Sequence, residues 1–72
     1  MTYPKQVVVR DCPTSDNLYK VGEHDGTYYV YQMDIGFLGD TSNKVGTARS
    51  FRDALDLIKA HSGGDNLEIG DW

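Results

Sequence analysis

The sequence contains a single cysteine, Cys12, and this scarcity sets the first limits on function. One thiol cannot form an intramolecular disulfide, which fits a reducing compartment. The only two histidines, His24 and His61, and the cysteine have none of the short repeated spacings of zinc sites, and no run of carboxylates is similar to a calcium-binding loop. We therefore expect no metal site and no cofactor.

Groups suited to acid–base or nucleophilic catalysis are few and scattered. His24 and Asp25 lie at a predicted turn, where both side chains stay in water, and His61 lies near the end of a predicted helix. Catalysis needs such groups to converge in a cleft, and the sequence places no nucleophile beside a base and no two carboxylates as a pair. We expect that the protein is not an enzyme.

Basic residues and long apolar runs are also scarce. Seven Lys and Arg stand against 11 Asp and Glu, which gives a formal net charge of −4 and a pI of about 4.8. Nucleic-acid binding relies on basic patches that contact phosphates, so this composition argues against nucleic acid as the partner. No apolar run is long enough to span a bilayer, and no basic-then-apolar leader is recognisable. We expect a soluble cytoplasmic protein with no membrane partner.

The sequence does carry a strong hairpin signal at residues 18–35. Asp25 and Gly26 separate two runs rich in β-branched and aromatic residues, and both tolerate the positive φ angles of a type I′ turn. This turn places Val21 opposite Val30, and alternation along each strand then defines two faces. The residues expected in the core are Tyr19, Val21, Tyr28 and Val30. The opposite face receives Lys20, Tyr29, Tyr31 and Met33.

One helix is predicted, over residues 50–62. Ser50 is a suitable N-cap, Asp53 follows three residues later, and Gly63 and Gly64 end the helix. Apolar residues recur at helical spacing between these limits, so we expect this helix to cover the core face of the hairpin.

Further strands are predicted on both sides of the hairpin. Residues 5–10 favour a first strand, and the third strand is expected to reach about residue 38 with a bulge or bend at Gly36. A turn at residues 40–43 then leads to a fourth strand at residues 44–48. The predicted fold is α+β: a small antiparallel sheet of three to four strands, packed on one face by a single C-terminal helix. Residues 1–64 form one domain, and residues 65–72 form either an acidic tail or a short edge strand.

One helix can cover only one face of this sheet, which leaves apolar groups on the other face. Aromatic residues are enriched at protein interfaces. We therefore expect a small non-enzymatic protein-interaction module that binds a protein partner or forms a homodimer. The candidate partner-binding residues are Tyr29, Tyr31, Met33, Phe37, Leu38 and Trp72.

A nucleic-acid-related function is the alternative. Lys44, Arg49 and Arg52 form a local basic cluster near the start of the helix, suited to weak contact with DNA or RNA phosphates. The acidic composition as a whole would instead suit mimicry of a nucleic acid. The expected order of strands followed by one helix is similar to that of the three-stranded DNA-reading domains of phage integrases and plant AP2 factors. Where those domains carry rows of Arg and Lys, this sheet face offers Tyr29, Tyr31 and Lys20.

Overall fold

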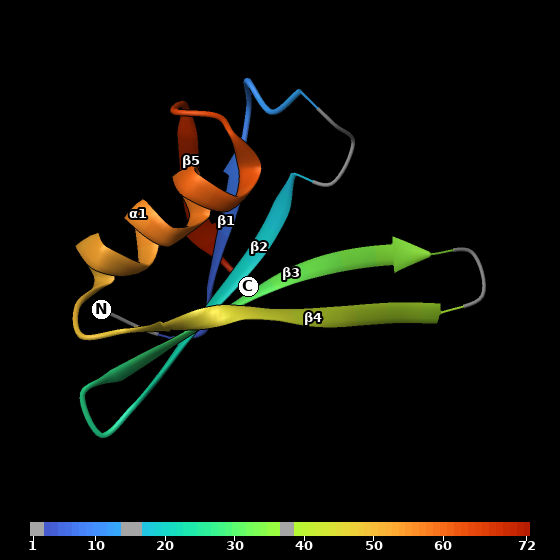
Figure 1. Cartoon of the computed structure of the whole chain (residues 1–72). Coiled ribbons are helices and arrows are strands. Elements are labelled where there is room, and N and C mark those ends of the chain that lie inside the picture. Colours follow the sequence, from blue (N-terminus) through green and yellow to red (C-terminus); the bar gives the residue numbers. More distant parts are fainter. Residues whose placement is uncertain (1–2, 14–16, 37–38) are drawn as a thin grey trace.

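The computed structural model describes residues 3–13, 17–36 and 39–72. It has an α+β fold in which a single helix packs on one antiparallel sheet (Figure 1). The elements in chain order are β1 (Lys5–Val9), β2 (Leu18–His24), β3 (Thr27–Gly36), β4 (Gly39–Ala48), α1 (Phe51–Ser62) and β5 (Leu67–Asp71). The sheet has five strands in the order β4-β3-β2-β1-β5. Within the described part of the chain, no helix is long and apolar enough to cross a membrane.

The central hairpin of β2 and β3 has the predicted register. Asp25 and Gly26 form the connection with φ angles of 51° and 79°, and Val21 pairs with Val30. The prediction is confirmed because its cause is local: positive φ at two adjacent positions gives a turn whose twist matches that of the flanking strands.

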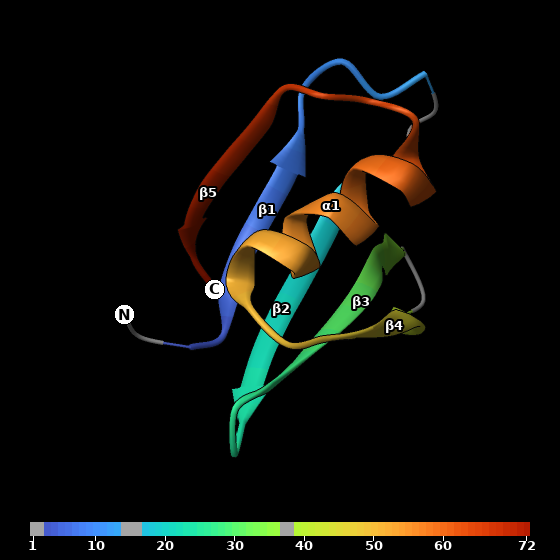
Figure 2. The same cartoon turned by 60° about the vertical axis from the view of Figure 1, so that its left-hand side comes forward.

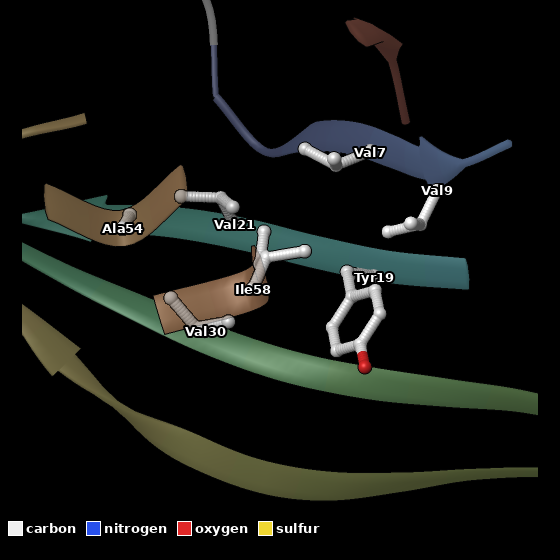
Figure 3. Packing of buried hydrophobic residues seen from close by; sticks show 7 residues of the cluster. All are labelled: Val7, Val9, Tyr19, Val21, Val30, Ala54 and Ile58. Atoms are coloured by element: carbon white, nitrogen blue, oxygen red, sulfur yellow. The ribbon is translucent and has the colours of Figure 1, made fainter. Parts of the chain in front are cut away.

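The core lies between this hairpin and α1, as expected. Ile58 and Ala54 of the helix are buried against apolar side chains of three strands (Figure 3). The fully buried strand residues are Val7, Val9, Tyr19, Val21 and Val30, whereas Tyr28 is partly buried at the edge of the core. The helix begins and ends as predicted, because the Ser50 hydroxyl accepts the Asp53 N–H at 3.1 Å and Gly63 adopts φ 81°.

The predicted turn at residues 40–43 is wrong. These residues belong to β4, which is ten residues long and pairs with β3 from Gly36–Gly39 to Tyr28–Ala48. Their Asp, Thr, Ser and Asn composition favours turns locally, but continuous pairing with β3 overrides that preference. In Figure 1 the two strands extend as a ribbon beyond the end of α1.

The bulge expected at Gly36 is also wrong in position. The register of β3 and β4 shifts between Val30, which pairs with Gly46, and Tyr31, which pairs with Lys44. Val45 is therefore the extra residue, and it packs against the core. Because one inserted residue changes which face the following side chains occupy, this bulge sets the orientation of the rest of β4.

The prediction of three to four strands is wrong by one strand, because β5 extends the sheet. Residues 65–72 were left between a tail and an edge strand, and β5 pairs with β1 from Val9–Leu67 to Lys5–Asp71 (Figure 2). The Asp11 carboxylate accepts the backbone N–H groups of Asp65 and Asn66 at 3.0 and 2.9 Å. This contact directs the chain after the helix onto the free edge of β1.

The Asp11 contact makes stability depend on pH. The two backbone N–H donors hold the pKa of Asp11 below its ordinary value of 3.8. A carboxyl group with a lowered folded-state pKa stabilises the fold above its unfolded-state pKa, and this contribution is lost as the pH falls through the folded-state pKa. We expect the free energy of unfolding to fall with acidification from about pH 5 downward.

The Asp11→Asn variant isolates this contribution. Ion pairs with Arg10 and Lys5 also lower the pKa of Glu68 and Asp71, and those carboxylates titrate in the same range in both proteins. In urea titrations, the wild type should lose more stability than Asp11→Asn between about pH 5 and pH 2. Parallel pH profiles of the two proteins would contradict this assignment.

Candidate functional site

The face of the sheet opposite α1 gathers most of the predicted partner-binding residues. Alternation in β2 and β3 turns Tyr19, Val21 and Val30 toward the helix and their neighbours away from it. We call this surface the outer face. Its members from the four strands β1 to β4 include Val8, Leu18, Lys20, Tyr29, Tyr31, Met33, Ser42 and Lys44.

A hollow lies near the middle of the outer face. It has a volume of about 350 Å³ and is lined by Lys20, Tyr31, Met33 and Ser42, which come from β2, β3 and β4. Tyr31, Met33 and Lys20 are half-buried, so each has accessible surface while its position is fixed by the sheet. A hollow that combines an ammonium group and hydroxyl groups with the Tyr31 ring and the Met33 side chain can receive a side chain from another molecule.

Two lysines on this face lie against aromatic rings. The Lys44 Nζ is 5.6 Å from the centroid of the Tyr29 ring, and the Lys20 Nζ is 5.1 Å from the centroid of the Trp72 ring. An ammonium over an aromatic face is attracted by the ring quadrupole, by about 0.5–1 kcal/mol at exposed sites. These contacts keep both rings and both charges together on one surface.

Trp72 reaches this surface through β5. The ion pair between Lys5 and Asp71, with an N–O distance of 2.6 Å, holds the end of the strand. The backbone N–H of Trp72 also donates to the Pro4 carbonyl at 3.3 Å. Trp72 remains 44% exposed. Four of the six candidate residues, Tyr29, Tyr31, Met33 and Trp72, thus share one region of the sheet, and Phe37 and Leu38 lie outside the described residues.

The basic cluster predicted for nucleic-acid contact is divided by the fold. Lys44 lies on the outer face, because the bulge at Val45 places it opposite Tyr31, whereas Arg52 is exposed on α1, on the other side of the sheet. Arg49 lines a groove of about 460 Å³ between the end of β4 and the helix. The sequence did not indicate this groove, which is lined by Thr47, Ala48, Arg49, Asp53, Asp56, Leu57 and Ala60.

The groups with catalytic chemistry have separate structural partners. The His61 Nδ1 and the Tyr19 hydroxyl are joined by a hydrogen bond of 2.8 Å, and the Cys12 thiol donates to the Ser62 carbonyl at 3.6 Å. His24 and Asp25 form an exposed pair at the hairpin tip, with 3.3 Å between Nε2 and Oδ2. In the portion of the chain that the structure describes, no group of three or more His, Cys, Asp or Glu side chains could hold a metal ion.

No family model, curated protein or solved structure matches this chain. The geometry of the outer face is therefore the basis on which a function is inferred.

The contact between Lys20 and Trp72 can be tested by fluorescence, because Trp72 is the only tryptophan. Replacing Lys20 by Ala removes the chain that covers one side of the ring, so acrylamide should quench Trp72 emission more strongly in Lys20→Ala than in the wild type. Lys59→Ala, at an exposed position of α1, is the matched control and should quench as the wild type does. Equal quenching in all three proteins would place Trp72 away from Lys20.

Proposed function

We propose that this protein is a small non-enzymatic interaction module that binds a protein partner, or a second copy of itself, through the outer face of its sheet. The observation that carries the proposal is the gathering of Tyr29, Tyr31, Met33 and Trp72 on the face that α1 does not cover. Large aromatic side chains on a solvent-accessible face are typical of protein interfaces.

The rigidity of the outer face supports this proposal. Tyr29 and Tyr31 lie on β3, which is paired on both sides by β2 and β4. Association is opposed by the entropy of ordering mobile side chains and loops, and residues already held by a sheet add little to that cost. A partner can therefore use the contact area of these rings with a small ordering penalty.

The size of the chain also favours a binding role. A domain of this length buries only about 60% of the surface that its unfolded chain exposes, so its own stability is modest. A partner that binds only the folded state stabilises it, by an amount that grows with the logarithm of the partner concentration once this exceeds Kd. A cytoplasmic location belongs to the same proposal, supported by a sequence with one cysteine and hence no intramolecular disulfide.

The nucleic-acid alternative has weaker support in the fold. Lys44, Arg49 and Arg52 do not form one basic surface, and Asp53 and Asp56 share the groove that Arg49 lines. Phosphate contacts need several cations along one track. The net charge of this chain is −4, which repels a polyanion.

The variant that tests the proposal is Tyr31→Ala, with Ile69→Ala as the matched control. Ile69 is 46% exposed and lies on the helix side of β5, so its truncation also removes exposed apolar surface but not from the outer face. We expect Tyr31→Ala to weaken association more than tenfold, since truncating a central interface aromatic costs about 2 kcal/mol or more.

Two measurements read out this association. Light scattering from micromolar to millimolar concentration reports self-association, and quantitative affinity capture from extracts of the source cells reports a foreign partner. Support requires a complex that forms with the wild type and with Ile69→Ala but is lost with Tyr31→Ala. A complex that Tyr31→Ala leaves intact, or the absence of both kinds of complex, would refute the proposal.

A further inference from the structure

The described side chains of the outer face carry a net charge opposite in sign to that of the whole chain. The formal net charge of the chain is −4. On the outer face, Arg10 and Glu68 form an ion pair of 2.7 Å, and their charges cancel. Lys20 and Lys44 form no ion pair with any described residue and lie instead against Trp72 and Tyr29. The described side chains of this face therefore leave two positive charges without a carboxylate.

The other described acidic side chains lie elsewhere in the fold. They belong to α1, to the loops, to the hairpin tip or to the helix side of the sheet, and they are Asp11, Glu23, Asp25, Asp34, Asp53, Asp56, Asp65 and Asp71. At the ionic strength of a cell, charges are screened over about 8 Å, so a bound segment is affected mainly by the charges of the face it contacts.

From this asymmetry we propose that the outer face binds an acidic, extended segment of a partner protein. The inference rests on the proposed function and adds the chemistry of the partner. Carboxylates of the segment pair with Lys20 and Lys44, and an apolar side chain between them enters the hollow beside Tyr31 and Met33. The hollow combines the Lys20 ammonium group with the Tyr31 ring and the Met33 side chain, so it can accept a carboxylate beside an apolar group.

The same charges disfavour a second copy of the chain as the occupant. Two outer faces related by a twofold axis would place two Lys20 and two Lys44 side chains in one interface, with no compensating carboxylate among the described side chains of that face. Burial of unpaired charges is unfavourable, and like charges that face each other across an interface repel. A foreign acidic segment removes this penalty and uses the same aromatic contacts.

An acidic peptide also fits better than a nucleic acid. A single strand brings a phosphate with every nucleotide, and the described part of the outer face offers only Lys20 and Lys44 as uncompensated cations. A peptide can place its carboxylates only where these lysines are and remain apolar in between. Such a peptide therefore brings fewer negative charges than a nucleic acid does, and the negative charge of the rest of the protein repels it less.

The experiment uses the full chain and a phage-displayed library of random peptides, with enriched sequences synthesised and titrated by fluorescence polarisation. We expect enriched peptides with at least two carboxylates flanking an aromatic or aliphatic residue, and a Kd that weakens as salt is raised. The double variant Lys20→Glu/Lys44→Glu should weaken binding more than tenfold.

The matched control is Arg52→Glu/Lys59→Glu, which changes the net charge equally at exposed positions of α1. Circular dichroism verifies that both double variants are folded. Equal loss of binding in the two double variants would show an effect of net charge alone and would overturn the inference.

Two further outcomes separate this inference from the proposed function. Neutral or basic peptides that need Tyr31 but bind Lys20→Glu/Lys44→Glu normally would overturn the acidic partner and leave the outer face as the interface. Peptides that bind Tyr31→Ala as tightly as the wild type would overturn both. Tighter binding of oligo(dT) than of any enriched peptide, lost in Lys20→Glu/Lys44→Glu, would replace the acidic peptide by a nucleic acid.

Discussion

The packing of one twelve-residue helix on a five-stranded sheet is the constraint on which the rest of the structure depends. Ile58 and Ala54 lie against Val21, Val30 and Tyr19, and this contact fixes which side of every strand faces the core. Complete burial of an aliphatic side chain such as that of Ile58 contributes about 1.5–3 kcal/mol, so reversal of the faces would remove the main source of stability. With a single helix available among the described residues, the outer face receives no second layer.

Elements whose cause is local could be predicted from the sequence. Asp25 and Gly26 determine the hairpin turn by their own φ angles, and Ser50 and Gly63 determine the helix ends by their own hydrogen bonds and conformation. The rest depended on distant contacts. β5 is placed by Asp11, which is 54 residues from Asp65 in the chain, and residues 40–43 are strand only because β3 is long enough to pair with them. The residues next to each segment in the sequence do not indicate either contact.

Some residues of the candidate site could likewise be assigned from the sequence, and others could not. Tyr29, Tyr31 and Met33 could be assigned to one face because alternation in the central hairpin is regular. The positions of Trp72 and Lys44 could not be predicted, since Trp72 needs β5 and Lys44 needs the bulge at Val45. In an unbroken register Lys44 would pair with Gln32 and face the helix side, and the bulge moves it opposite Tyr31. One inserted residue thus places Lys44, one of the two uncompensated cations among the described side chains, on the outer face.

The central claim is that the sheet is covered on one face only, and solvent paramagnetic relaxation tests it directly. A neutral gadolinium chelate added to a dilute sample enhances the relaxation of methyl groups according to their exposure. We predict strong enhancement for the Met33 methyl group on the outer face and little for the Ile58 methyl groups in the core on the other side of the sheet. Met33 protected as well as Ile58 would contradict the account, because the outer face would then already be covered.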